Sequence, residues 1–237
     1  INIDLTAADQ VVSMDGGTNT AVQTGFESVD LSSFSGFGAV VTGSDEANTI
    51  VGTASADNIS GGKGADIITG GNGNDVLAGG SSADTFIFSL LASNGVDTIS
   101  DFETGTTDDL LNVKLLGAGA IAGKADVAAG GTVADASDTQ IAYVFADGAT
   151  ASGGQTVADY TDLTDVLAFL NAALTIEAAD VDGVAIINDL TTDTAYIYNM
   201  DVDGAADTDI ESITLVGTVT ISTADTPLTA ADHVIFA

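Results

Sequence analysis

The chain has 237 residues, of which 35 are acidic and only 3 are basic, so its formal net charge is -32 at pH 7. Without a basic patch it cannot displace counterions from phosphates, which excludes nucleic acid as a partner, and an anionic membrane surface would repel it. Hydrophobic residues make up 45% of the chain, enough to build a core in spite of the charge. Length alone allows one large all-β unit or two smaller ones.

All but five of the acidic residues are aspartate, which suits turns and short metal-binding loops better than helix faces. A salt-loving habitat is the alternative explanation of this acidity. Cysteine is absent, so neither disulfides nor thiolate zinc sites hold the fold, and calcium could take their place in a secreted protein. Residues 1–10 do not form a classical signal peptide and no apolar run approaches membrane-spanning length, so we expect no membrane insertion. A start at Ile1 suggests a fragment or a processed chain.

The first predicted strands lie in the segment GFESVDLSSFSGFGAVV, residues 25–41, where two short apolar stretches are separated by turn residues. They are in phase with the repeats that follow. We therefore interpret residues 1–42 as coils of the same solenoid.

Five nonapeptides follow in register from Gly43: GSDEANTIV, GTASADNIS, GGKGADIIT, GGNGNDVLA and GGSSADTFI. Each has a polar residue in the sixth place, namely Asn48, Asp57, Asp66, Asp75 and Asp84. Each has an apolar residue in the eighth place, namely Ile50, Ile59, Ile68, Leu77 and Phe86. The first six residues predict a turn that needs glycine, and the last three a short strand with its middle residue pointing inward. Two nonapeptides complete one coil, so the period predicts a parallel β-roll.

The sixth-place residues should stack in two rows at roughly the 4.8 Å spacing of neighbouring strands. Like charges that close repel by about 1 kcal/mol even in water, and a hard divalent cation between successive turns reverses the sign. Carboxylates with turn carbonyls suit calcium, whereas magnesium needs a smaller octahedral shell, and zinc and copper prefer other ligands. We therefore predict several calcium ions. The predicted ligands in the roll are Asn48, Asp57, Gly61, Gly62, Lys63, Gly64, Asp66, Gly70, Gly71, Asn72, Gly73, Asp75, Gly79, Gly80, Ser81 and Asp84.

The core of such a roll is thin, with one inward residue per nonapeptide, so metal binding and folding should be one event. We expect this segment to be disordered without calcium. The turns are unequal: the third and fourth have every glycine of the pattern, whereas the fifth has Ser82 in the fourth place. The first two have other residues in the second and fourth places, namely Ser44, Glu46, Thr53 and Ser55. The strongest sites should therefore involve turns two to five.

These repeats resemble the calcium-binding nonapeptides G-G-x-G-x-D-x-U-x of the RTX family of secreted Gram-negative proteins. The segment ADTFIFSLLASNGVDTISDF, residues 83–102, resembles the family's exit from the roll. That resemblance implies that Phe86 and Phe88 close the core and that Asp97 and Asp101 add ligands or turn contacts. The segment ETGTTDDLLNV, residues 103–113, resembles the family's continuation.

In that continuation, Asp108 or Asp109 takes the acidic position. Members of this family leave the cell by type I secretion, guided by an uncleaved C-terminal signal, and fold on meeting external calcium. The end of this chain, LTAADHVIFA, is similar to such a signal. The resemblance thus implies a secreted or cell-surface location, with the type I secretion machinery as a partner in transit.

Four distal segments predict strands bounded by turn residues: 141–146, 184–188, 194–199 and 211–221. One helix is predicted from the spacing of Leu163, Val166, Leu167, Leu170 and Leu174. Thr161 is its predicted N-cap, with Asp162 and Asp165 in the first turn. The segment NDLTTDT, residues 188–194, predicts a hairpin turn.

A second acidic cluster follows, with Asp201, Asp203, Asp207 and Asp209 in one loop between strands. It predicts either a further calcium site or a solvated turn, and its spacing is not that of an EF-hand.

Groups for catalysis are scarce. His233 is the one histidine, and there is neither a cysteine nor a G-x-S-x-G elbow. GGKGAD is not a phosphate loop, because Lys63 lacks a following serine or threonine. We therefore predict that the chain is not an enzyme.

Together these features predict an all-β fold: a calcium-bound parallel β-roll or β-solenoid, followed by a β-rich C-terminal domain with one helix. The predicted parts are 1–42, coils without calcium; 43–113, the RTX roll and its cap; and 114–237, the β-rich domain with the secretion signal. The first hypothesis for function is a calcium-binding extracellular structural module that self-assembles into a surface layer or matrix. Its partners would be copies of itself, with a cell-surface polysaccharide as a further candidate. The alternatives are a secretion and folding module of an RTX protease or lipase, and part of a large adhesin.

Overall fold

The computed structural model describes residues 1–6, 11–14, 17–18, 27–89, 94–104, 109–114, 123–127, 133–134, 141–145, 156–175, 183–189, 191–201, 210–221, 227–229 and 234–235. Strands dominate them, and α1 is the single helix among them. The predicted all-β class with a parallel roll and one helix is confirmed. No helix in this described part is long and apolar enough to cross a membrane.

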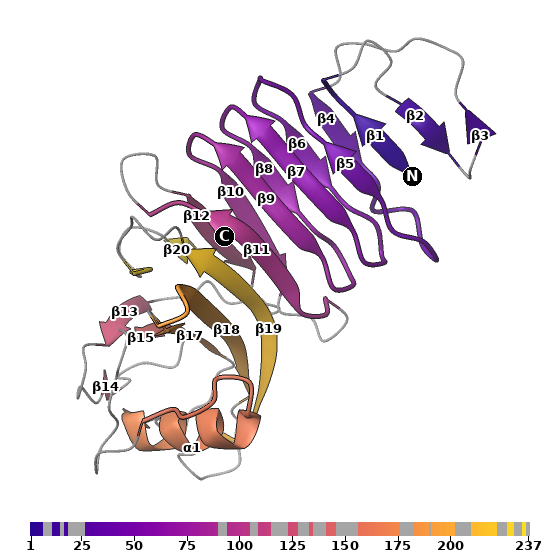
Figure 1. Ribbon diagram of the computed structural model, residues 1–237. Coiled ribbons are helices and arrows are strands. Elements are labelled where there is room, and N and C mark those ends of the chain that lie inside the picture. Colours follow the sequence, from indigo (N-terminus) through magenta and orange to yellow (C-terminus); the bar gives the residue numbers. More distant parts are fainter. Residues whose placement is uncertain are drawn as a thin grey trace.

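The roll consists of two facing parallel sheets that the chain visits in turn (Figure 1). One sheet contains β4 (Ser28–Asp30), β6 (Thr49–Val51), β8 (Ile67–Thr69), β10 (Thr85–Ser89), β12 (Leu110–Lys114) and β20 (Val234–Ile235). The other contains β1 (Asn2–Asp4), β5 (Val40–Thr42), β7 (Asn58–Lys63), β9 (Val76–Ser81) and β11 (Asp97–Phe102). Within the repeats, Ile50 pairs with Ile68 and Ile59 with Leu77, two nonapeptides apart. One coil is therefore two nonapeptides, as predicted.

The core of the roll is the row of eighth-place residues. Ile50, Ile59, Ile68, Leu77 and Phe86 are all fully buried. They alternate with outward-facing neighbours, as the period of a strand requires. Phe88 and Phe102 complete this core beyond the last nonapeptide, so Phe86 and Phe88 do close it.

The coils continue upstream of the repeats. β4 lies within residues 25–41, where two strands were predicted, and β5 begins there and ends one residue later. They pair in parallel with β6 and β7. β1 extends the same parallel sheet, but β2 (Val11–Met14) and β3 (Gly17–Thr18) add to it antiparallel. The N-terminal end of the solenoid is thus finished by antiparallel strands.

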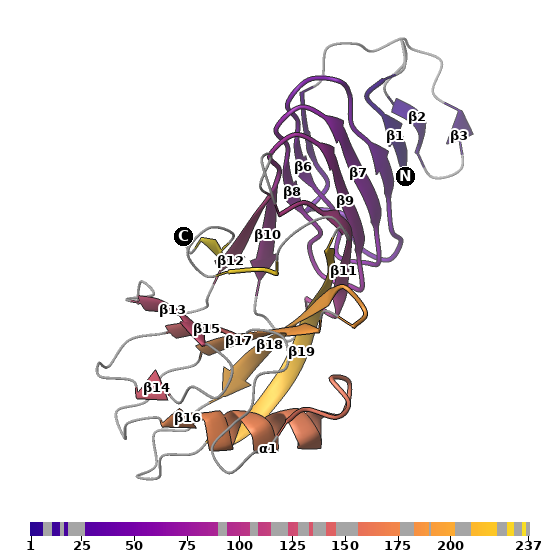
Figure 2. The same cartoon turned by 60° about the vertical axis from the view of Figure 1, so that its left-hand side comes forward.

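The distal strands are part of the same sheet as the roll. β19 (Ser212–Ile221) pairs in parallel with β11, and it is followed by β18 (Thr194–Asp201), β17 (Gly183–Asp189), β15 (Ile141–Phe145) and β13 (Gly123–Val127). The result is one sheet of 12 strands that runs from the roll into the distal region, as Figure 2 shows from the side. The sequence predicted β15, β17, β18 and β19, together with the hairpin turn between β17 and β18. It did not predict that β19 joins the roll.

The helix α1 (Leu163–Ala173) packs against the distal sheet and buries Val166, Phe169 and Leu170. The ring of Phe169 meets that of Phe145 edge to face at 5.3 Å. β14 (Val133–Ala134) and β16 (Leu174–Thr175) form a separate two-stranded sheet.

The predicted N-cap of α1 was wrong by one residue. Asp162 is the N-cap, and its side chain accepts a hydrogen bond from Thr164 N. Thr161 is instead held by Asp159, whose Oδ1 accepts from Thr161 N at 2.8 Å and from Thr161 Oγ1 at 2.7 Å. Leu163, predicted on the apolar face, is 39% exposed, and Leu174 begins β16.

Candidate metal centre in the turns of the roll

The sixth-place residues form two rows, which we name the first edge and the second edge. On the first edge, Asp66 Oδ1 accepts from Asn48 N at 2.7 Å and Asp84 Oδ1 from Asp66 N at 2.8 Å. On the second edge, Asp75 Oδ1 accepts from Asp57 N at 2.8 Å. Each carboxylate therefore reaches back to the turn one coil earlier, and the predicted stacking is present in the structure.

Three carboxylate oxygens in these rows lack any hydrogen-bond partner. They are the Oδ2 atoms of Asp66, Asp75 and Asp84, and each side chain is only 1% exposed. Among the described residues, Asn112 Oδ1 in β12 is the other atom of this kind. An unpaired buried polar group costs about 1–3 kcal/mol, and an unpaired charge costs more. These three oxygens therefore fit a bound cation.

Burial also shifts the ionisation of the three side chains. It raises the pKa of Asp66 to about 6 and the pKa values of Asp75 and Asp84 to about 7. Repulsion from neighbouring carboxylates adds to the effect, from Asp57 on Asp75 and from Asp109 on Asp84. A cation beside each oxygen would favour the ionised form and offset both causes.

The turns that hold these three carboxylates share one backbone shape. The second and fourth places have positive φ in all three: Gly62 (107°) and Gly64 (94°), Gly71 (109°) and Gly73 (119°), Gly80 (104°) and Ser82 (93°). Ser82 thus adopts the glycine conformation despite its Cβ. The fifth turn therefore keeps the shape of the two turns that have every glycine.

Stacked turns approach each other too closely for a side chain. A Cβ placed on Gly80 would lie 1.9 Å from Gly62 O. A Cβ on Gly61 would lie 2.2 Å from Asp66 Oδ2 and 2.7 Å from Gly79 O. The free carboxylate oxygen and a carbonyl of the next coil therefore lie on the same side of Gly61. Carboxylate and carbonyl oxygens are the ligands that calcium prefers.

The first two turns are different. In the second, Asp57 Oδ2 accepts from Thr53 N at 2.6 Å, and Oδ1 accepts from Thr53 Oγ1 at 2.9 Å and Ala39 N at 2.6 Å. In the first, Asn48 Oδ1 accepts from Ser44 N at 2.7 Å. The second and fourth places of both turns lack positive φ. In both turns the side-chain oxygens in the sixth place thus already accept hydrogen bonds from protein donors.

Both rows end beyond the repeats on side chains that also have protein donors. Asp97 Oδ1 accepts from Asp75 N at 3.1 Å and its Oδ2 from Asn94 Nδ2 at 2.8 Å. Asp109 Oδ1 accepts from Asp84 N at 2.9 Å and its Oδ2 from Glu103 N at 2.9 Å. Burial raises the pKa values of both Asp97 and Asp109 to about 7.

Asp101 makes a different contact at this end of the roll. Its two carboxylate oxygens accept from Gly79 N and Gly80 N, both at 3.0 Å. It therefore fixes the start of the fifth turn. Asp97 and Asp101 thus make the turn contacts that the family resemblance implied, and their role as ligands stays a prediction.

The remaining predicted ligands are distributed as follows. The Lys63 side chain points to solvent, where its Nζ pairs with Asp45 Oδ2 at 2.8 Å, so only its main chain belongs to the turn. Asp201 ends β18 and accepts from Ser212 Oγ at 3.3 Å. Five further residues named in the sequence analysis lie outside the described ranges: Asp108, Asp203, Asp207, Asp209 and His233.

Within the described ranges, no cluster of three or more Asp, Glu, His or Cys side chains could hold a metal ion. Sites in the roll would therefore combine few carboxylates with main-chain carbonyls. The donors Thr53, Asn94 and Glu103 N were not predicted from the sequence. The signal for Thr53 was present, because a hydroxyl residue stands there in place of the second glycine.

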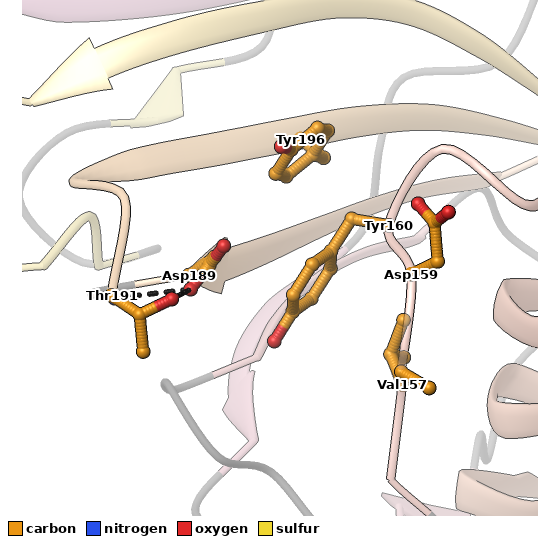
Figure 3. A pocket seen from close by; sticks show the side chains of 7 residues that line it. Val157, Asp159, Tyr160, Asp189, Thr191 and Tyr196 are labelled. Atoms are coloured by element: carbon orange, nitrogen blue, oxygen red, sulfur yellow. Dashed lines mark hydrogen bonds between the residues drawn. The ribbon is translucent and has the colours of Figure 1, made fainter.

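A cavity of about 560 Å³ lies in the distal region, between the segment before α1 and the β17–β18 hairpin (Figure 3). The rings of Tyr160 and Tyr196 stack there at 5.1 Å. Asp189 accepts from Thr191 N at 3.0 Å and from Thr192 Oγ1 at 2.7 Å, and Asp159 is held by Thr161. Both carboxylates thus shape their own turns, which contrasts with the free oxygens of the roll.

Comparison with known families points to the same segment. A model of the RTX calcium-binding nonapeptide repeat, which contains four copies, matches residues 42–77 and again residues 51–86. No curated protein matches the chain. The two matches together cover the five nonapeptides except for Ile87, and repeats of this kind indicate calcium binding in a secreted protein.

Proposed function

Since the chain is an RTX repeat protein, we propose that its roll is the calcium-triggered folding unit of a structural protein that assembles outside the cell. Calcium binding follows from the repeats themselves. The assembly, the surface-layer or matrix role and the extracellular location are our proposal.

One observation supports this function above the others: the free, buried Oδ2 atoms of Asp66, Asp75 and Asp84. A folded roll without cations would leave three carboxylate oxygens without partners in its interior. Its thin core offers little to offset that cost, because each nonapeptide buries one large apolar side chain. Folding of the roll therefore requires the cation, and a calcium-poor cell interior would keep the chain unfolded for secretion.

The link to assembly rests on the sheet and on the charge. β11 of the roll pairs with β19 of the distal region, and Thr98 Oγ1 and Thr218 Oγ1 are hydrogen-bonded across that junction at 3.3 Å. Order that calcium creates in the roll would therefore template the distal sheet. A net charge of -32 keeps copies of the chain apart until calcium neutralises part of it. Calcium would then act as both folding trigger and assembly trigger.

We further propose that the chain is not an enzyme and that type I secretion carries it out of the cell. The carboxylates around the distal cavity are committed to their own turns, which supports a structural role for this region. The C-terminal resemblance to a secretion signal supports the export route.

The test uses the full chain in chelator, in calcium, and in magnesium at equal ionic strength. Circular dichroism should show little regular β signal in chelator, a cooperative gain in calcium and little gain in magnesium. Light scattering and electron microscopy of the calcium sample should then show sheets or fibres that chelator dissolves. A full β signal in chelator would refute the folding role, and a persistent monomer in calcium would refute the assembly role.

The alternative is a secretion and folding module attached to an RTX enzyme or a large adhesin. It shares the calcium-dependent folding but predicts a monomer at every calcium concentration. The sheet shared by roll and distal strands favours a structural unit, because a passenger module needs no such continuity. The scattering measurement separates the two.

A further inference from the structure

The five nonapeptides are not equivalent in the structure, although the family match spans all of them. We infer that calcium sites are confined to the three turns that hold Asp66, Asp75 and Asp84, and that the first two nonapeptides are metal-free coils that cap the roll. This inference rests on the proposed function, because it assumes that the roll binds calcium. It departs from the expectation that every repeat contributes an ion site.

The sixth-place side chains differ in their hydrogen bonding. In the second turn, Asp57 receives three donors, two of them from Thr53 in its own turn. In the fourth turn, which lies one coil later on the same edge, Asp75 Oδ1 has the equivalent donor from Asp57 N, and its Oδ2 has none. The donors that satisfy Asp57 thus take the place that a cation would take beside Asp75.

The backbone of the two turns differs as well. Thr53, whose N–H donates to the carboxylate of its own turn, lacks positive φ. Its counterpart Gly71 has a φ of 109° and a Cβ there would lie 2.2 Å from Thr53 O. In the fourth turn, where the second and fourth places have positive φ, Asp75 Oδ2 has no hydrogen-bond partner. Glycine in the second place therefore decides between a metal turn and a metal-free turn.

The first turn also lacks a charge in the sixth place. Its sixth place holds Asn48, a neutral residue whose Oδ1 accepts from Ser44 N and whose Nδ2 donates to Glu27 Oε2 at 3.2 Å. The Asn48 amide thus accepts a hydrogen bond from the N–H of the second place, as the Asp57 carboxylate does in the second turn. A turn of this type thus works without a negative charge and without a cation to balance it.

The test counts calcium bound to the full chain at saturation, by mass spectrometry of the metal after gel filtration. The matched pair is Asp57→Asn and Asp75→Asn, the same change in neighbouring turns of the second edge. Asp57→Asn should bind as many ions as the unmodified chain, whereas Asp75→Asn should bind at least one fewer. Equal losses in both variants would overturn the inference.

A second variant, Asn48→Asp, provides an independent test if Asp57→Asn does not fold. It adds a carboxylate to the first turn but no glycine. We expect no additional ion, because the main chain still supplies the donors. One additional ion would overturn the inference. If the unmodified chain bound no calcium at all, the proposed function would fail as well, so the two failures are distinguishable.

Discussion

Ser82 holds a backbone conformation that suits glycine, and replacing it should stabilise the roll. It stands in the fourth place of the fifth turn with a φ of 93°, where Gly64 and Gly73 have 94° and 119°. Its side chain is exposed, so glycine removes no packed atoms. An L-residue in the left-handed region costs about 1–2 kcal/mol, whereas glycine costs about 0.5–1 kcal/mol through the greater freedom of the unfolded chain. The net expected gain for Ser82→Gly is about 0.5–1 kcal/mol.

Ser81→Gly is the matched control, because Ser81 is also exposed but lacks positive φ. This variant relieves no strain, so it should lose about 0.5–1 kcal/mol. In saturating calcium, thermal unfolding followed by circular dichroism should place the two midpoints on opposite sides of that of the unmodified chain. For a chain of this size, 1 kcal/mol corresponds to about 2–4 °C. Equal shifts of the same sign would show that the positive φ of Ser82 stores no strain.

Three further predictions follow. Without calcium, burial raises the pKa values of Asp75 and Asp84 in the folded roll to about 7, against an ordinary 3.8. Protonation of these carboxylates therefore stabilises the folded roll below pH 4, and this stability is lost as the pH rises through 7. Circular dichroism in chelator should therefore show more β signal at pH 4 than at pH 8, and the reverse order would contradict the burial of these carboxylates. Leu77→Ala, in the middle of the core, should cost about 2–5 kcal/mol in chemical denaturation with calcium present, and a loss below 1 kcal/mol would contradict its full burial. Gly217→Ala would place a Cβ 2.5 Å from the Phe88 ring, so it should lower the midpoint of thermal unfolding, whereas an unchanged midpoint would show that the junction of β11 and β19 can adjust.

The sequence predicted the roll well because its determinants are local. A period of nine fixes both the turn and the one inward residue, so the pairing of Ile59 with Leu77 follows from the repeat alone. The helix was also predicted from its apolar spacing, but its first residue was not. Thr161 and Asp162 are both good N-caps, and the choice depends on Asp159, which binds Thr161 in a separate turn.

The junction between roll and distal sheet could not be predicted in the same way. β11 and β19 are far apart in the sequence, and each has a strand pattern that fits many partners. Which partner it takes depends on the close contact of Gly217 with Phe88 and on the shared register of Thr98 and Thr218. Such a contact exists only after folding, so no local sequence pattern predicts it.

The division of the five turns was visible in the sequence, but its meaning was not. The missing glycines predicted unequal sites, with the strongest in turns two to five. In the structure, Thr53 and Ser44 donate their own N–H groups to the sixth-place side chain, which supports our inference that these two turns are metal-free. On this inference, the residues that replace glycine supply the hydrogen bonds of a metal-free turn.

These hydrogen bonds also explain how a roll can depend on calcium without unravelling from its ends. An ion between stacked turns needs ligands from both, so a terminal turn would leave an ion half coordinated and exposed. Here both edges finish on protein donors, with Thr53 before Asp75 and with Asn94 after it on the second edge. The carboxylates that need a cation are therefore enclosed between coils that do not. On our proposal, calcium decides whether the middle of the roll folds, and the capped ends confine that dependence to the turns of Asp66, Asp75 and Asp84, whose Oδ2 atoms have no protein partner.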